Sequence, residues 1–279
     1  MGGNELRREI IAIGEGAGAR SIGVAFYDYQ TRTGWSYHGD TWFHAASTIK
    51  VPVLVGVFGA IRDGRFTTES RLHVRNRFLS AHDGTPYRVA ADRDANSAVH
   101  AQIGRTMKIR ELAHHMISTS SNLATNLLVD LVGVGEIRDT LEGLGINGIE
   151  LHRGVEDERA WEAGLNNRVT ANGLLETLRR IAEKRAFSEE ASEQMLEILH
   201  AQEFKSGIPA GLPDNARVAH KTGEISSVAH DAGVVFLPDR EPYVIVILTE
   251  WETGAGGRSE MIAGISRLVY ENVTESDRE

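Results

Sequence analysis

A serine and a lysine lie three residues apart in the segment Ser47-Thr48-Ile49-Lys50, which precedes a strongly apolar run. If a helix begins there, Ser47 and Lys50 share one face, and a neutral lysine amine can accept the proton of the serine hydroxyl. Pro52 limits how far back regular helical bonding reaches, which places Ser47 near the helix N-terminus, where free N–H groups favour an oxyanion. Taken alone the motif is common, and a capping serine with a solvated lysine is its ordinary explanation.

Two further short motifs have residue types suited to binding and cleaving an acyl substrate. Ser120-Ser121-Asn122 lies between two segments of helical spacing, and Lys221-Thr222-Gly223 ends a β-rich run. Each has an ordinary explanation by itself, as a pair of capping residues and as a strand that enters a turn. Together with Ser-x-x-Lys, and in this order along the chain, they closely resemble the motif set of class A β-lactamases and penicillin-binding proteins.

The chain resembles the class A β-lactamases and related penicillin-recognising serine hydrolases over nearly its whole length. Residues 21–40 resemble the opening hairpin of that family, residues 43–50 its nucleophile segment, and residues 118–130 its second motif with the following helix. Residues 161–166 are similar to the Glu-x-x-Leu-Asn pattern of its omega loop, and residues 221–223 to its third motif. The resemblance implies a serine hydrolase whose site lies in a cleft between two domains.

The resemblance also implies a role in acylation for each matching residue. Ser47 would attack a strained cyclic amide, Lys50 would act as base or proton relay, and Ser120 would pass a proton to the leaving nitrogen. Asn122 would hold the side-chain amide of the substrate, and the backbone N–H groups of Ser47 and Glu224 would form the oxyanion hole. This chemistry needs no metal ion and no organic cofactor.

The third motif is expected to bind the substrate. The resemblance implies that Lys221 and Thr222 face the substrate's carboxylate, and the absence of a side chain at Gly223 permits close approach. Glu224 stands where the family usually has a small or hydroxyl residue. Because a carboxylate there should repel that of a penicillin by about 1 kcal/mol, we expect weak activity on penicillins relative to uncharged or differently charged acyl substrates.

Two positions compete for the role of deacylation base. Glu162 matches the omega-loop pattern and would hold a water as general base, with Asn166 binding the same water. Only three residues separate Asn166 from the helix start at Thr170, fewer than the family usually has. We assign the role to Glu162; Glu156 and Asp157, a few residues earlier, could fold over the site instead and are the alternative.

Two other departures from the family lie at and before the second motif. Ser121 stands where the family usually has Asp, and this puts a structural carboxylate in doubt more than it does catalysis. The gap between the first and second motifs is longer than usual, so residues 83–97 are interpreted as an insertion near the mouth of the site. Residues 73–104 are polar and irregular throughout and predict a long loop.

The composition excludes several classes of protein. The 279 residues include 30 Lys and Arg against 39 Asp and Glu, a net charge of −9, and no cysteine. The negative charge argues against a general nucleic-acid binder, and the lack of cysteine excludes disulfides, thiolate zinc sites and a cysteine nucleophile. No apolar run approaches the roughly 20 residues of a membrane-spanning helix. We expect a small-molecule substrate, a β-lactam or a peptidoglycan-like amide, and a monomer.

The hydrophobic periods predict strands at both ends of the chain and helices between them. The predicted helices are 5–17, 50–61, 107–116, 121–143, 170–185, 188–201 and 262–273, and the predicted strands are 22–26, 35–38, 218–222, 232–237 and 243–249. The fold class is therefore α/β (α+β), with one antiparallel sheet from both chain termini flanked by helices and an inserted, mainly helical domain. We expect residues 1–40 and 206–279 in the sheet domain and residues 41–205 in the helical domain.

Three other functions remain open. A D-alanyl-D-alanine peptidase or penicillin-binding protein and an esterase-like hydrolase have the same fold, and a β-lactam sensor would be acylated once without turnover. The N-terminal sequence MGGNELRREI lacks the apolar core of a signal peptide. Family members are usually exported, so the resemblance implies a periplasmic or extracellular protein despite that N-terminus.

Overall fold

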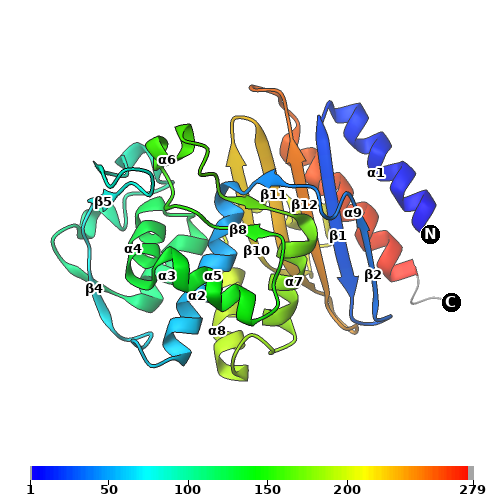
Figure 1. The fold of residues 1–279 in the computed structure, drawn as a ribbon. Helices are drawn as coiled ribbons and strands as arrows, with labels where there is room; N and C mark the ends of the chain where they lie inside the picture. The colour runs from blue at the N-terminus through cyan, green and yellow to red at the C-terminus, as the bar shows by residue number, and fades with distance from the viewer. Residues whose placement is uncertain (1, 276–279) are drawn as a thin grey trace.

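A five-stranded antiparallel sheet joins the two ends of the chain (Figure 1). The computed structural model describes residues 2–275. The order in the sheet is β10-β11-β12-β1-β2, from β10 (Arg217–Ile225), β11 (Val228–Phe236), β12 (Tyr243–Glu250), β1 (Ser21–Asp28) and β2 (Thr33–Tyr37). The pairing of β1 with β12 brings the N-terminal hairpin against the C-terminal strands and confirms the predicted sheet.

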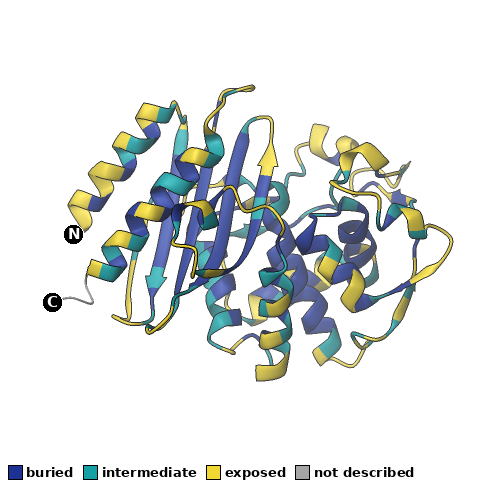
Figure 2. Cartoon of the chain, turned by 180° about the vertical axis from the view of Figure 1, so that it is seen from behind, coloured by how far each residue is buried: buried dark blue, intermediate teal, exposed yellow. Residues whose placement is uncertain are grey.

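Helices cover both faces of this sheet. On one face lie α1 (Gly3–Ala17) and α9 (Arg258–Glu275), which cross in front of the strands in Figure 2. They bury Leu6 and Ile10 against one set of alternating strand residues, which includes Val24. The intervening residue Ala25 belongs to the core on the other face, where α7 (Ala171–Ala182) and α8 (Glu189–His200) pack. The alternation that predicted the strands therefore separates two hydrophobic cores.

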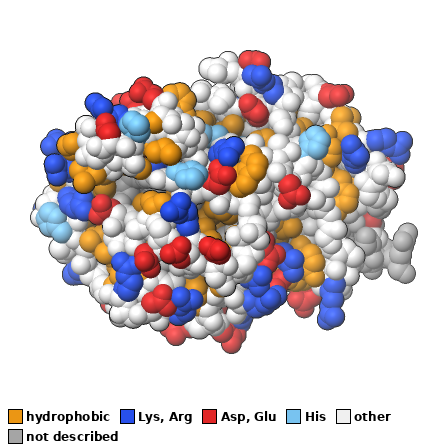
Figure 3. Space-filling view, in the orientation of Figure 1, with side chains coloured by type: hydrophobic (Ala, Val, Ile, Leu, Met, Phe, Trp, Pro, Cys, Tyr) orange, Lys and Arg blue, Asp and Glu red, His pale blue; other side chains and the backbone are white. Residues whose placement is uncertain are grey.

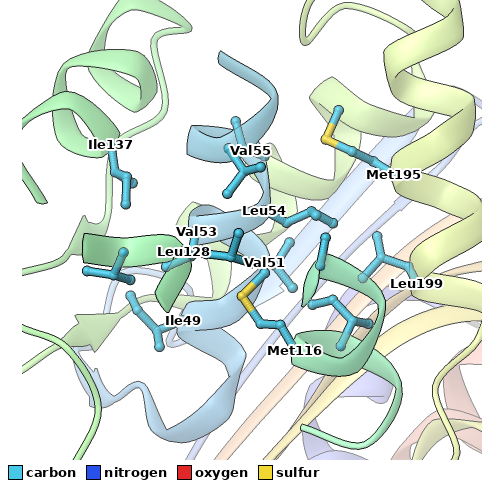
Figure 4. Close-up of a cluster of buried hydrophobic side chains, with 14 of the residues drawn as sticks. Ile49, Val51, Val53, Leu54, Val55, Met116, Leu128, Ile137, Met195 and Leu199 are labelled. Atoms are coloured by element: carbon cyan, nitrogen blue, oxygen red, sulfur yellow. The ribbon is translucent and has the colours of Figure 1, made fainter. Parts of the chain in front are cut away.

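One buried helix organises the helical part of the molecule. In α2 (Lys50–Arg62), every residue from Lys50 to Ala60 is buried. A helix that is apolar on all sides must be surrounded by others, and α2 packs among α3 (Ile109–Ser118), α4 (Asn122–Val132) and α5 (Val134–Gly143), as Figure 4 shows. The first residue of this apolar helix is the lysine of the first motif, so the packing of α2 carries Lys50 out of solvent.

Two predictions about the middle of the chain need correction. The predicted helix over 121–143 is two helices, because Gly133 adopts φ +96° between α4 and α5, a conformation that glycine favours. The predicted loop over 73–104 contains four short ordered elements, β5 (Phe78–Leu79), β6 (Pro86–Tyr87), η2 (Ala91–Arg93) and η3 (His100–Gln102).

The remaining short elements lie elsewhere in the chain. They are β3 (Phe43–His44), η1 (Ala46–Ile49), β4 (Arg71–His73), β7 (Thr106–Lys108), β8 (Ile149–Glu150), α6 (Glu158–Glu162), β9 (Arg168–Val169) and η4 (Ile208–Gly211).

The division into two domains at residues 40 and 206 stays a prediction. Among the described residues, one hydrophobic cluster contains side chains of the sheet and of the inserted helices together, including Ala232 and Leu54. Within residues 2–275, no helix has both the length and the apolar character needed to cross a membrane.

Candidate active site

The second motif, the first motif and the end of β10 meet at one cleft of about 680 Å³. Its walls come from η1, the turn before α4, the segment 153–162 and residues 224–226. Of the residues singled out in the sequence, those that line the cleft are Ser47, Ser120, Asn122, Glu156, Asp157, Glu162 and Glu224, whereas Lys50, Asn166, Lys221, Thr222 and Gly223 are not on its wall. Acidic and basic side chains are interspersed over the face of the molecule seen in Figure 3.

Lys50 connects the first motif to the second. Its Nζ donates to the carbonyl oxygen of Ser120 at 2.7 Å, to Ser120 Oγ at 3.0 Å and to Asn122 Oδ1 at 2.8 Å. Three acceptors match the three donors of an ammonium group. Burial lowers the pKa of Lys50 to about 7, although the negative charges of Asp94 and Glu156 oppose that shift. An amine with this pKa exists in both protonation states near neutral pH and can therefore accept and return a proton.

Ser47 is half-buried and lies in η1, a 3-10 turn that leads directly into α2. The sequence placed Ser47 near a helix N-terminus; in the structure Ser47 lies in η1, and Lys50 is the first residue of α2. Three of the described non-glycine residues that line the cleft have positive φ: Ala46 at +45°, Ser120 at +58° and Glu156 at +59°. Such conformations cost free energy and cluster at functional sites. The N–H of Ala46 donates to His44 Nδ1 at 3.0 Å, which stabilises the turn before the serine.

The third motif packs directly against the first. A Cβ atom at Gly223 would lie 3.0 Å from the backbone nitrogen of Thr48 and 3.1 Å from that of Ser47, so a side chain there would force η1 and β10 apart. Lys221 is fully buried behind the wall of the cleft. Burial, and then the charge of Lys50, lower the pKa of Lys221, while Asp231 opposes the shift. Lys221 Nζ donates to the carbonyl oxygen of Thr222 at 2.8 Å.

Glu224 has a partner that the sequence did not indicate. Its Oε1 accepts from Arg258 Nη2 at 2.6 Å, and the same guanidinium donates to the carbonyl oxygen of Ile225 at 2.8 Å. Arg258 begins α9, 34 residues beyond Glu224. The carboxylate at the mouth of the cleft is therefore paired with a cation, and its repulsion of an anionic substrate is weaker than for an isolated Glu224.

The two candidate bases differ in their contacts. Glu156 accepts from Asn122 Nδ2 at 3.1 Å and from Arg93 Nε at 2.9 Å, and only a fifth of its side chain is exposed. Its backbone has φ +59°. Glu162 lines the cleft from the exposed end of α6. Both carboxylates face the cleft, and Glu156 is the one bonded to a residue of the second motif.

The predicted water ligand Asn166 lies off the wall of the cleft, whereas its neighbour Asn167 is on that wall. The side chain of Asn167 is occupied, because Oδ1 accepts from the N–H groups of His152 and Arg153, and Nδ2 donates to the carbonyl oxygen of Arg153. Through these three hydrogen bonds, Asn167 fixes the start of the segment 153–162, which forms one wall of the cleft.

Sequence reasoning missed the contribution of the segment before η3. Arg93 and Asp94 reach the second motif from the region interpreted as an insertion, where Arg93 binds Glu156 and Asp94 binds Ser121. No local pattern distinguishes these two residues from their charged neighbours. Within residues 2–275, no group of three or more His, Asp or Glu side chains is placed to hold a metal ion.

Comparison with known proteins agrees with the motifs. A beta-lactamase of Bacteroides uniformis is 30% identical over 180 residues, and that match spans 60% of this chain and 60% of the relative's length. The structure of PBP-A is similar with a TM-score of 0.80, 25% identity, and coverage of 98% of this chain and 96% of the other; a mutant of PBP-A has been solved as an acyl-enzyme complex with penicillin G.

A solved beta-lactamase from Sphaerobacter thermophilus is similar over 98% of both chains, with 25% identity and a TM-score of 0.80. The expected fold, an antiparallel sheet with helices and a helical insertion, is the fold of these structures. Residues 5–273 match the beta-lactamase enzyme family as a whole. The chain is a class A-like member of the beta-lactamase enzyme family.

Proposed function

We propose that this protein hydrolyses β-lactam amides through an acyl-enzyme on Ser47. The observation that carries the proposal is the buried Lys50 amine bonded to Ser120 and Asn122, one turn beyond a serine that lines the cleft. A buried base of this kind, next to an accessible hydroxyl, is the arrangement that nucleophilic catalysis requires.

The proposed chemical steps combine these contacts with the roles that the family resemblance implies. Lys50 accepts the proton of Ser47 as the serine oxygen forms a bond to the amide carbon, and the N–H groups of Ser47 and Glu224 stabilise the oxyanion. The carbon–nitrogen bond then breaks, and Ser120 passes the proton from Lys50 to the leaving nitrogen, which the hydrogen bond of 3.0 Å between Lys50 Nζ and Ser120 Oγ supports. Asn122 binds the side-chain amide of the substrate, and Lys221, Thr222 and Gly223 bind its carboxylate end.

Water must next release the acyl group, and a carboxylate is its general base. The contacts favour Glu156 for this role, because it is bonded to Asn122 and its charge acts on Lys50. Glu162 is the alternative, and it matches the sequence pattern from the exposed end of α6. We retain Asn166 as a water ligand only in the alternative that uses Glu162, since it lies off the cleft wall.

The second candidate function is a D-alanyl-D-alanine peptidase or penicillin-binding protein. The structural similarity to PBP-A favours it as an alternative. The two functions differ in deacylation, since a hydrolase of β-lactams releases its acyl group in seconds and a penicillin-binding protein stays acylated for hours. By the same family resemblance we propose that the native protein is exported and acts as a monomer.

Steady-state hydrolysis of benzylpenicillin distinguishes the two functions. Continued opening of the β-lactam ring over many equivalents of substrate supports the β-lactamase. A burst of one equivalent followed by no turnover assigns the penicillin-binding function instead.

A further inference from the structure

Asp94 lies outside every motif, but its side chain is fully buried against the turn that carries Ser120 and Asn122. One carboxylate oxygen accepts from Ser121 Oγ at 2.8 Å, and the other accepts from the N–H of Asn122. The first oxygen also lies 3.5 Å from the backbone nitrogen of Leu123 and 3.4 Å from His100 Nε2. A single carboxylate thus binds the second motif at its side chain and its backbone.

The bonded groups are those at the start of α4. Ser121 caps this helix by accepting from the N–H of Ala124, and its hydroxyl hydrogen is directed to Asp94. A negative charge near the N-terminus of a helix is favourable, because the free N–H groups there give the helix end a partial positive charge. The turn just before the cap contains Ser120 at φ +58°, so it needs such contacts to hold its conformation.

The charge of Asp94 also reaches the base. The negative charges of Asp94 and Glu156 both act on Lys50, and the charge of Lys50 acts in turn on Lys221. Of the two carboxylates, Asp94 does more to raise the pKa of Lys50 against the lowering effect of burial. Glu156 also binds the guanidinium of Arg93, whereas Asp94 is buried next to the imidazole of His100.

We propose that Asp94 is a positioning residue for acylation, which holds the Ser120–Asn122 turn in place from the 73–104 segment. This inference rests on the proposed roles of Ser47 and Lys50. It assigns a function to a segment whose sequence indicated only a long polar loop. The segment is then part of the site's scaffold, because it brings a carboxylate that the second motif itself does not contain.

The test compares Asp94→Asn with Asp92→Asn. Both variants lose one negative charge from the same segment, but Asp92 is exposed on η2. The rate of adduct formation with benzylpenicillin is measured by rapid quench and intact mass from pH 5 to 9. We expect Asp94→Asn to acylate at least about tenfold more slowly at its optimum and to shift the acid limb to lower pH, because Lys50 loses a stabilising anion. Asp92→Asn should stay within about twofold, with its acid limb unchanged.

A double variant tests the same hydrogen bond from its other end. Asp94→Ser combined with Ser121→Asp moves the carboxylate across the 2.8 Å contact and keeps the net charge. Recovery to within about threefold of the wild-type acylation rate supports the proposal. A folded double variant, shown by an unchanged melting temperature, that acylates no faster than Asp94→Asn contradicts it.

Hydrogen exchange separates this inference from the proposed function. The amide exchange of residues 119–128 is measured by mass spectrometry in the wild type and in both single variants. If the wild type forms no adduct, the proposed function fails, and faster exchange in Asp94→Asn than in Asp92→Asn still supports the positioning role. If the wild type forms the adduct and the two variants match it in rate, pH profile and exchange, Asp94 is not a positioning residue.

Discussion

The two walls of the cleft are built differently. On one wall, Lys50 is fully buried and bonded to Ser120 and Asn122, which leaves its amine with three fixed partners. On the other wall, Glu162 is exposed at the end of a five-residue helix, and Glu156 is held by Arg93 and Asn122. In the proposed mechanism, the buried wall carries out the attack on the substrate, and the exposed wall determines how long the acyl group stays bound.

If the protein acts as proposed, this difference implies that acylation and deacylation depend on separate parts of the chain. Residues of the buried wall are fixed by the packing of α2 and β10, whereas the 153–162 wall is fixed by side-chain contacts such as those of Asn167. Variants of the first wall should abolish adduct formation, and variants of the second should change the lifetime of the adduct.

The largest effect is expected from Ser47→Ala. Removal of the nucleophile should lower the turnover of a β-lactam by about a millionfold, as deletion of a catalytic serine does. Turnover is measured with benzylpenicillin and adduct formation by intact mass. A covalent adduct on the alanine variant would show that another residue is the nucleophile.

Substitution of the two buried lysines should give unequal losses. Arginine is always protonated, so Lys50→Arg should lower the acylation rate by about a thousandfold or more, which is the size of a general-base contribution. Lys221→Arg keeps the charge and should mainly raise KM. Equal losses of acylation in the two variants would refute this division of roles.

The pH dependence of the wild type follows from the same residue. Acylation requires neutral Lys50, whose pKa is about 7 in the folded protein. The rate should therefore rise with pH through a midpoint near 7 and become constant above it. A rate of acylation that does not change between pH 5 and 9 would contradict the assignment of Lys50 as the base.

On the exposed wall, Glu156→Gln and Glu162→Gln form a matched pair with the same chemical change. The variant that removes the base should acylate almost normally and release its acyl group about a hundredfold to ten-thousandfold more slowly. We expect the trapped adduct with Glu156→Gln, measured by its decay in intact mass. A trap with Glu162→Gln would restore the assignment favoured by the sequence pattern.

The smallest effect concerns the paired charges at the mouth of the cleft. Glu224→Ser removes a carboxylate and releases Arg258, so KM for benzylpenicillin should fall by about fivefold, equivalent to about 1 kcal/mol. Arg258→Gln should raise KM, because it leaves Glu224 without its partner. An unchanged KM in Glu224→Ser would show that this carboxylate does not face the substrate.

The sequence was sufficient for the fold because its signals are local. Alternating residues such as Val24 and Ala25 face different cores, and the helix predicted over the apolar run from Lys50 is confirmed. The three motifs were also visible locally; residues of the first two line one cleft, and the third packs against the first.

Contacts between distant segments could not be predicted in this way. Asp94 and Arg258 are ordinary charged residues in the sequence, and only the fold places them against Ser121 and Glu224. The choice between Glu156 and Glu162 failed to resolve for the same reason, since it depends on how the 153–162 wall folds rather than on any residue pattern. The positive φ of Gly133 divides the predicted helix over 121–143, and the spacing of apolar residues in the sequence does not reveal this break.

Intact mass after mixing with benzylpenicillin, followed from milliseconds to hours, tests the central claim most directly. The proposed mechanism predicts that the mass of the protein rises transiently by that of one penicillin, that peptide mapping locates the adduct at Ser47, and that the adduct disappears as hydrolysed product accumulates. A protein that never gains this mass, or that carries it on a residue other than Ser47, would contradict the account.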